Sequence, residues 1–292
     1  MKPAPFRYQR AGSLEEALAI VGSAVAVDED ARVIAGGQSL GPMLNLRMVR
    51  PTLLVDIHRI APLRAVTRRA DGRVRIGACV THAALEDAPL DGPLSGSAGD
   101  FIRHVAGGIA YRAIRTRGTI GGSLAHADPA ADWPCALAAL GATIEVVGPA
   151  GERRIDAGEF SLGLFETALQ PGEIICAIEL PAAPVLRWGY RKHCRKVGEF
   201  PHALAACVVR DAGARAQVWL GATGGAPVSL ELDAPAPGAL AALPEGQQAR
   251  LRAGLRASIA ALLPAAVAQG DAYARHLHAQ IAAEAVIDAC LR

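Results

Sequence analysis

Two short glycine-rich segments stand out in this sequence: residues 33–40 read VIAGGQSL and residues 119–124 read TIGGSL. In each, a Gly-Gly pair lies beside a hydroxyl residue and a short apolar element. Glycine permits positive φ and close approach of a ligand to the backbone. Successive amides can then converge on an anion, with the hydroxyls of Ser39, Thr119 and Ser123 as further donors. One such pair alone is more often a tight turn closing a hairpin, but two segments of the same composition favour one diphosphate held from two sides.

The pattern around the first segment predicts a β-α-β unit. A short strand is expected at residues 6–10, and a capping box at residues 13–16 starts a helix that ends near Val21. Residues 32–35 and 52–57 are apolar runs typical of buried strands. The first glycine pair therefore follows directly after the second strand of the unit.

The remaining chain mixes further strands and helices, with a loop expected at residues 89–99 and a boundary at the prolines of residues 181–184. The expected strands cover residues 74–78, 143–147, 174–180, 203–210 and 216–220. The expected helices cover residues 100–106, 129–140, 247–262 and 273–291.

Composition excludes several classes of function. A net charge of +2 over 292 residues is too small to indicate nucleic-acid binding. The six cysteines are scattered, whereas iron–sulfur clusters and structural zinc need closely spaced thiolates. Scattered cysteines fit a reducing, cytoplasmic setting. The first ten residues lack the apolar region of a signal peptide, and no apolar run is long enough to span a membrane.

A dinucleotide-binding motif of the Rossmann type is the first alternative. A strand, a glycine pair and an acid about 20 residues later, Gly36 to Asp56, superficially fit it. The full G-x-G-x-x-G pattern is absent, and Pro42 stands where the helix of that motif should run. No G-K-[ST] follows either glycine segment, which excludes a P-loop.

Other chemistry-bearing residues have simpler interpretations. His126, Asp128 and Asp132 imitate a metal site, but no second histidine follows His126 at i+4, so structural or ligand-contact roles are favoured and no metal site is predicted. The basic stretch at residues 112–117 is typical of a solvated face. It could alternatively dock an acidic partner or offset a diphosphate.

Longer stretches resemble a known family. VIAGGQSLGPMLNLRMVRP, RIGACVTHAAL and RTRGTIGGSLAHADPAADWPCALAAL occur in this order, followed by PGEIICAIELP, GYRKHCRK and LGATGGAPV. The chain resembles the FAD-binding medium subunit of molybdenum hydroxylases, the xanthine oxidase and carbon monoxide dehydrogenase family, over essentially its whole length. Both glycine motifs occur in the right order, which makes the resemblance specific.

The resemblance implies an α+β fold with two parts. Residues 1–180 would form a two-subdomain FAD-binding domain of the vanillyl-alcohol-oxidase and molybdenum-hydroxylase type, divided at about residue 58 into subdomains 1–58 and 59–180. Residues 185–292 would form a smaller C-terminal α/β domain.

The resemblance also implies which residues bind FAD. The backbone of both glycine segments would surround the diphosphate and ribityl part, Asp132 would contact the flavin, and Ser123 replaces the asparagine usual at its position with a shorter hydrogen-bonding side chain. The implied FAD contacts are Ala35, Gly36, Gly37, Gln38, Ser39, Leu40, Ile109, Thr119, Ile120, Gly121, Gly122, Ser123, Asp132, Ile175 and Arg191.

No set of nucleophile, base and orienting residue is evident, so we predict no catalytic side chain, and the protein positions and tunes the flavin. The resemblance implies two partners, a small subunit with 2Fe–2S clusters and a large subunit with a molybdopterin cofactor, usually as a dimer of heterotrimers. Electrons from the partner's clusters would reach FAD in this chain and leave to an external acceptor.

Two rival functions stay open at this point. A stand-alone flavin-dependent oxidoreductase would need an acid or base above the flavin ring, for which His193 or Glu199 are candidates. A flavin-free assembly or binding module would keep the fold without the cofactor, but the intact glycine motifs argue against it.

Overall fold

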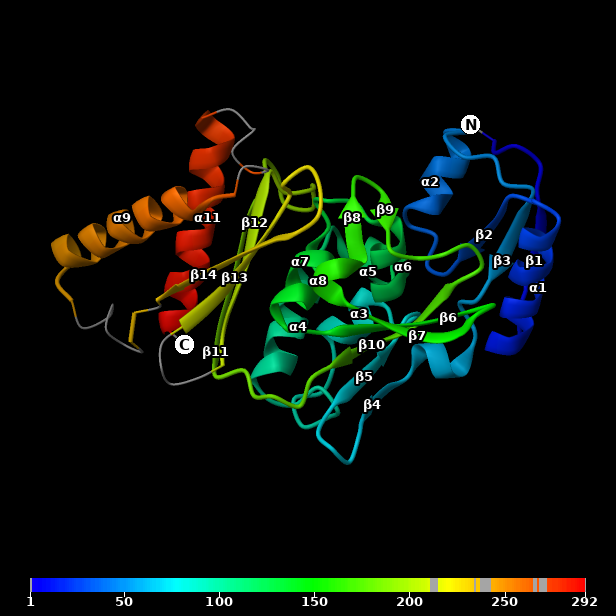
Figure 1. The fold of residues 1–292 in the computed structure, drawn as a ribbon, viewed down its shortest axis with the longest axis horizontal. Helices are drawn as coiled ribbons and strands as arrows, with labels where there is room; N and C mark the ends of the chain where they lie inside the picture. The colour runs from blue at the N-terminus through cyan, green and yellow to red at the C-terminus, as the bar shows by residue number, and fades with distance from the viewer. Residues whose placement is uncertain are drawn as a thin grey trace.

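The computed structural model describes residues 2–210, 215–233, 235–236, 243–264, 267 and 272–291. Three β-sheets follow one another along the long axis of the molecule in sequence order (Figure 1). A two-stranded hairpin, β8 (Ser161–Gly163) with β9 (Glu166–Thr167), lies beside the middle sheet. The short helices outside the sheets are η1 (Ala61–Arg64), α5 (Arg112–Arg115) and α8 (Ala157–Phe160).

The first sheet has the predicted β-α-β form. Its parallel strands lie in the order β1 (Arg7–Arg10), β3 (Leu53–Asp56), β2 (Ala31–Ile34). Helix α1 (Leu14–Ala26) connects β1 to β2, and α2 (Leu40–Asn45) follows the first glycine segment. Because the carboxyl ends of parallel strands meet at one edge, the first glycine pair and the residues after β3 lie together.

The middle sheet is antiparallel throughout, and its inner face forms the largest core. The core includes Trp133, Phe101 and Ile120, all fully buried. The strands, in spatial order, are β4 (Val66–Arg68), β5 (Val74–Gly77), β10 (Ile174–Leu180), β6 (Thr143–Gly148) and β7 (Gly151–Asp156). The associated helices are α3 (His82–Glu86), α4 (Ser97–Gly108), α6 (Ile120–His126) and α7 (Asp132–Ala139).

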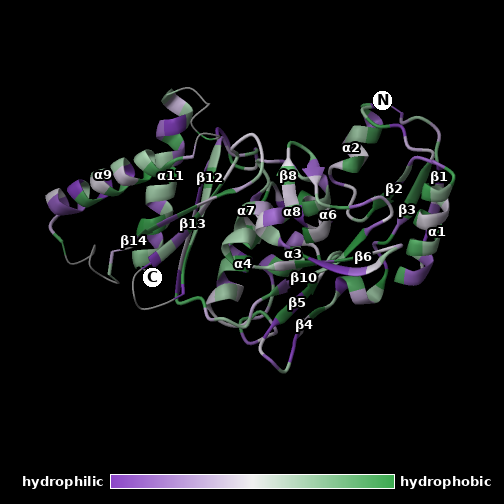
Figure 2. Ribbon diagram, in the orientation of Figure 1, coloured by the Kyte–Doolittle hydropathy of each residue, from purple (hydrophilic) through white to green (hydrophobic). Residues whose placement is uncertain are grey.

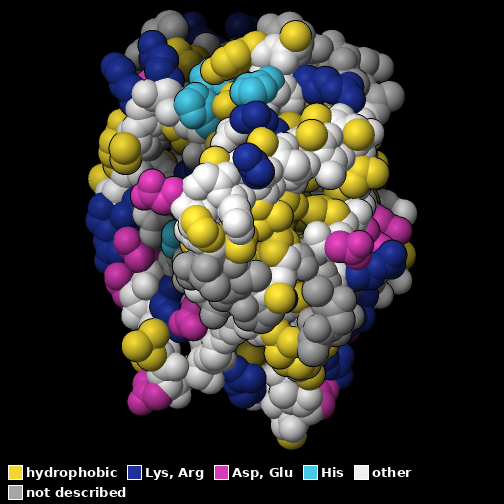
Figure 3. Space-filling model, turned by 90° about the vertical axis from the view of Figure 1, so that its left-hand side faces the viewer, with side chains coloured by type: hydrophobic (Ala, Val, Ile, Leu, Met, Phe, Trp, Pro, Cys, Tyr) yellow, Lys and Arg dark blue, Asp and Glu magenta, His cyan; other side chains and the backbone are white. Residues whose placement is uncertain are grey.

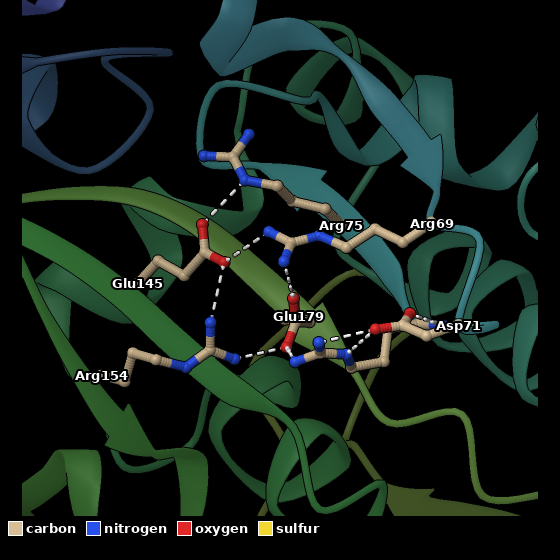
Figure 4. Close-up of polar contacts among 7 residues, drawn as sticks. Arg69, Asp71, Arg75, Glu145, Arg154 and Glu179 are labelled. Atoms are coloured by element: carbon tan, nitrogen blue, oxygen red, sulfur yellow. Dashed lines mark hydrogen bonds and ion pairs between the residues drawn. The ribbon is translucent and has the colours of Figure 1, made fainter.

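The other face of this sheet carries an ion-pair network (Figure 4). Glu179 on β10, whose side chain is 3% exposed, accepts hydrogen bonds from Arg73, with an N–O distance of 2.9 Å, and from Arg154. Arg69 lies 3.1 Å from the second oxygen of Glu179. Glu145 on β6 binds the same Arg69 and Arg154. The network thereby ties three neighbouring strands, β10, β6 and β7, to the β4–β5 turn.

Three predicted helix boundaries were wrong. Helix α1 continues past Val21 because Ala24 extends its buried face. Helix α4 begins at Ser97, within the expected loop, and a Cβ on Gly99 would lie 1.5 Å from the Leu94 carbonyl oxygen, so glycine lets the first turn pack on that loop. Helix α7 begins only at Asp132, since the Asp128 carboxylate accepts from the Ala130 amide at 2.9 Å and holds the preceding residues in a turn.

The third sheet is an antiparallel meander covered by one helix, and a second helix packs on the first. The strands are β11 (Arg187–His193), β12 (Ala203–Val209), β13 (Arg215–Gly221) and β14 (Val228–Asp233), and the helices are α9 (Glu245–Leu262) and α11 (Ala272–Leu291). A Cβ on Gly189 would lie 1.8 Å from the Ala285 carbonyl oxygen, so α11 packs directly on the backbone of β11. Phe101 of α4 meets Trp188 of β11 edge-on, with ring centroids 5.4 Å apart, which joins this sheet to the middle core.

Hydropathy follows the burial of these elements. In Figure 2 hydrophobic residues follow the inner strands, whereas hydrophilic and hydrophobic residues alternate along α9, which packs on α11 and buries only Leu255 and Ile259. Within the described ranges, no helix combines the length and the apolar character needed to cross a bilayer.

Candidate functional site

The first glycine segment touches the residues that directly precede the second. A Cβ on Gly36 would lie 2.0 Å from the Arg117 carbonyl oxygen and 2.9 Å from the Gly118 Cα. Residues far apart in the sequence therefore touch through their backbones, at a position where only glycine fits. This arrangement is the one expected if both segments bind one ligand.

The first segment leaves its donors free. Gly37 adopts a left-handed φ of +69°. The amides of Gly37, Gln38 and Ser39 donate to no acceptor in the described part of the chain, and the Ser39 side chain makes no capping bond to α2. Consecutive free amides that include a left-handed glycine form an anion-binding concavity. The residues present thus fit a diphosphate-bearing cofactor.

The second segment differs from the expected loop, because it begins a helix. Thr119 is buried and caps α6, and its hydroxyl oxygen accepts from the Gly122 amide at 3.1 Å. The amides of Ile120 and Gly121 donate to Val80 and Ala78, and that of Ser123 donates to Thr119. The amides predicted to converge on an anion here are therefore already bonded, and the exposed Gly122 and half-buried Ser123 contribute only their outer surface.

Asp132 lies where the middle and third sheets meet. Its Oδ1 accepts from the Tyr190 hydroxyl and from Lys192 Nζ, each at 2.6 Å, and Lys192 also donates to the Gly108 carbonyl at 2.8 Å. Burial, together with the negative charge of Asp132, raises the pKa of Tyr190 well above its usual range, so the hydroxyl stays protonated and donates. Tyr190 and Lys192 were not among the predicted residues, although the GYRKHCRK motif contains both.

A cavity of about 600 Å³ opens beside this cluster. Its lining residues are Glu86, Arg103, His104, Gly107, Gly108, Tyr190, Arg191 and Lys192. The predicted contact Ile109 ends α4 directly after Gly108, and Arg191 lines the cavity while its guanidinium pairs with Asp288 at 2.6 Å. Ile175 instead lies on β10 within the apolar core of the middle sheet, where 5% of it is exposed.

His126 and the arginines of the basic stretch, for which the sequence allowed more than one role, contact residues of this chain. The His126 ring packs on Phe165, with centroids 5.1 Å apart. Arg115 pairs with Glu86 at 2.8 Å, and Arg112 pairs with Glu86 and Asp87, so most of the basic stretch is neutralised within the chain. Among the residues that the structure describes, no three histidine, cysteine or acidic side chains are grouped to hold a metal ion.

The candidate acid–base residues of a stand-alone enzyme lie outside the cavity beside Asp132. Histidine side chains gather beside lysine and arginine side chains at one end of the face that α9 and α11 present (Figure 3). His193 is exposed, and its ring centroid lies 6.3 Å from that of His202. Glu199 pairs with Arg195 at 2.9 Å. Neither side chain lines the cavity beside Asp132.

The comparison with known families decides the assignment. The family described as the FAD binding domain in molybdopterin dehydrogenase matches residues 4–183. The chain belongs to this FAD-binding family. FAD is accordingly its cofactor, and the relatives described next are subunits of molybdenum-dependent oxidoreductases.

Named relatives extend the similarity beyond the matched domain. The medium subunit of nicotine 6-hydroxylase from Paenarthrobacter nicotinovorans is 37% identical over 229 residues, which is 77% of this chain and 76% of the relative. The medium chain of carbon monoxide dehydrogenase from Afipia carboxidovorans is 37% identical over 217 residues, 74% and 72% of the two chains.

Solved structures of family members cover almost the whole chain. A chain of quinoline 2-oxidoreductase from Pseudomonas putida 86 superposes with a TM-score of 0.80 at 29% identity, over 99% of this chain and 98% of the other. Carbon monoxide dehydrogenase from Hydrogenophaga pseudoflava gives a TM-score of 0.78 at 33% identity, over 99% and 98%. The α+β molybdenum-hydroxylase flavoprotein fold expected from the sequence is thereby confirmed.

Proposed function

We propose that this chain is the FAD-carrying electron-transfer subunit of a heterotrimeric molybdenum hydroxylase. It would accept electrons from the 2Fe–2S clusters of a small partner subunit and pass them to an external acceptor. A large partner subunit would hold the molybdopterin cofactor, and two heterotrimers would associate. The cytoplasm is the proposed location, and residues 1–58, 59–180 and 185–292 are the proposed structural units.

The contact between Gly36 and Arg117 carries this proposal. It supports a ligand that reaches both the free amides of Gly37, Gln38 and Ser39 and the second glycine segment, because the residues next to each touch. A diphosphate in this position would be held by backbone donors, whose fixed geometry needs no side-chain ordering. Ala35 and Leu40 flank the amides and would contact the same ligand.

The flavin end is assigned to the region around Asp132. When bound, FAD supplies the redox chemistry. Lys192 and Tyr190 hold Asp132 in place, Arg191 lines the adjoining cavity, and Ile109 directly follows the lining residue Gly108. These side chains would orient the ring and exclude water from one side. Ile120, Gly121, Gly122, Ser123 and Ile175 complete the proposed contact set.

The names of the relatives support the partners. Nicotine 6-hydroxylase and carbon monoxide dehydrogenase each contain a chain described as medium, which aligns with most of this one. A medium chain implies a smaller and a larger one. The rival function, a stand-alone flavoenzyme, lacks support from the site because His193 is exposed and Glu199 is occupied by Arg195.

Absorption spectroscopy of the purified full chain, with identification of the cofactor released by heat, tests the flavin. Bands near ~370 and ~450 nm that yield FAD are expected. A colourless protein that takes up no added FAD would refute the proposal and favour the assembly module. Affinity purification from the native cell tests the partners: two further polypeptides, one with iron and one with molybdenum, are expected, and a chain that purifies alone with substrate-reducible FAD would favour the stand-alone enzyme.

A further inference from the structure

Three arginines lie close enough to His58 for their charges to act on it, beside the first glycine segment, and one of them, Arg59, shares its turn. His58 follows β3, and its amide donates to Asp56 Oδ1 at 2.8 Å. The neighbouring Ile57 amide donates to the Ile34 carbonyl at 3.1 Å, which places this turn alongside the end of β2. The charges of Arg117, Arg64 and Arg59 all act on the His58 imidazole.

The three guanidinium groups are uncompensated. Arg59, Arg64 and Arg117 are exposed, and none of their guanidinium groups forms a hydrogen bond or ion pair with another residue in the described ranges. In the same basic stretch, by contrast, Arg112 and Arg115 are bound by acidic side chains. Together with His58, these three arginines form the arginine cluster.

The acid nearest to the cluster is already occupied. Asp56 Oδ2 accepts from Tyr8 and, at 3.1 Å, from Arg10, while Oδ1 accepts from the His58 amide. His58 Nδ1 is buried and has no hydrogen-bond partner among the described residues. A buried ring nitrogen without a partner is costly unless a ligand satisfies it. The cluster therefore offers both positive charge and an unused polar atom.

A phosphate matches this set of groups. Guanidinium forks bind phosphate oxygens through paired, charge-assisted hydrogen bonds. Burial, followed by the charges of Arg117 and Arg64, lowers the pKa of His58, so at neutral pH its ring is uncharged and can donate from one nitrogen only. The Arg117 backbone lies on Gly36, so the cluster borders the free amides of residues 37–39.

We propose that the arginine cluster binds the diphosphate of FAD and selects the dinucleotide over riboflavin 5′-phosphate. This inference rests on the proposed function. Backbone amides alone bind any phosphate, whereas an added cationic group increases the affinity for a ligand with two phosphates. The cluster thus explains why one arginine of the basic stretch stays unpaired.

The test uses the full chain freed of flavin and titrated with FAD, riboflavin 5′-phosphate and ADP. Arg64→Gln with Arg117→Gln removes two charges, and Arg215→Gln is the matched control, another exposed arginine, on the third sheet, paired with Glu231. The double variant should bind FAD about a hundredfold more weakly, at about tenfold for each lost charge-assisted contact. Binding of riboflavin 5′-phosphate should change much less, and ADP should lose its competition with FAD.

Several outcomes separate the inference from the proposed function. A double variant that binds FAD with unchanged affinity and salt dependence overturns the arginine cluster while the proposed function stands. A wild-type chain that binds no FAD overturns both. A variant that keeps FAD but no longer retains its partner subunits shows that the cluster docks an acidic protein surface instead. Arg64→Lys with Arg117→Lys should restore part of the affinity, and circular dichroism confirms that each variant is folded.

Discussion

Trp133 donates a hydrogen bond from its indole Nε1 to Nδ1 of His82 at 3.1 Å, and both side chains are buried. The His82 amide donates to the Gly118 carbonyl at 2.9 Å, while Trp133 directly follows Asp132. This pair therefore connects the second glycine segment to the start of α7. Protonation of His82 would disturb both ends of the site.

The stability of the protein should depend on pH through His82. Burial, and then the charge of Arg115, lowers the pKa of His82 from 6.5 to about 4. Between these values the unfolded chain binds more protons, so stability falls as the pH decreases from 6.5 toward 4, by about 2 kcal/mol at pH 5. Urea unfolding at pH 7 and pH 5 measures the difference. His82→Gln, which does not titrate, should flatten the profile in this window; an unchanged slope would assign it to other groups.

Substitution of Gly36 should separate the two glycine segments. Gly36→Ala puts a Cβ against the Arg117 carbonyl, which must move. We expect the free energy of unfolding to fall by about 1–3 kcal/mol, and the variant to bind less FAD. Gly41→Ala is the matched control, because a Cβ there meets nothing within 4 Å. The flavin-to-protein absorbance ratio and thermal unfolding report both effects. Full flavin content in Gly36→Ala would show that this contact does not shape the site.

The buried Glu179 should contribute more to stability than the exposed Asp71 of the same network. Burial would raise the pKa of Glu179, but Arg154, Arg69 and Arg73 lower it overall, so its contribution is present above pH ~4.5 and lost as the pH falls through the lowered value. Glu179→Gln should lower the free energy of unfolding by about 2 kcal/mol. The loss stays moderate because the arginines are half-exposed and can be hydrated once the carboxylate is gone. Asp71→Asn, at a side chain 47% exposed, should cost less than about 0.5 kcal/mol. Equal losses in denaturant titrations would argue against the network in Figure 4.

Lys192 should be needed to keep Asp132 in place. Lys192→Met leaves the buried carboxylate of Asp132 with Tyr190 as its only donor among the described residues, and should lower the stability of the fold by about 2–4 kcal/mol. Lys196→Met, at an exposed residue nearby, should stay within about 0.5 kcal/mol of wild type. Combining Lys192→Met with Asp132→Asn should recover part of the stability. Additive losses in this double-mutant cycle would mean that the two side chains are not coupled.

Local sequence signals were enough to predict much of this architecture. The β-α-β unit was predicted from the capping box and the apolar runs. The proximity of the two glycine segments was predicted because both could bind one diphosphate, not from the periodicity of the sequence. Strand β11 was not predicted. Its first four residues, 187–190, are all buried and the next three are polar, so the sequence lacks the alternation of apolar and polar residues that indicates a strand. Helix α6 was missed because Gly121 and Gly122 are poor helix formers, and packing against Ala78 outweighs that preference.

The remaining parts of the site depend on long-range contacts. Arg112 and Glu86 pair across 26 residues of chain, so the sequence could not show which arginines of the basic stretch are neutralised. The pairing of Lys192 with Asp132 spans 60 residues and requires that the third sheet is already docked. Only the packed fold distinguishes Arg117 from its neighbours.

The packing of α11 on Gly189 has a consequence for biosynthesis. β11 supplies Tyr190 and Lys192 to Asp132, and that strand is covered by a helix that ends at Leu291. During translation, the first glycine segment emerges from the ribosome long before this helix exists. The groups proposed to bind the flavin end would therefore be complete only after α11 has been made, and stable insertion of the cofactor would follow the synthesis of that helix.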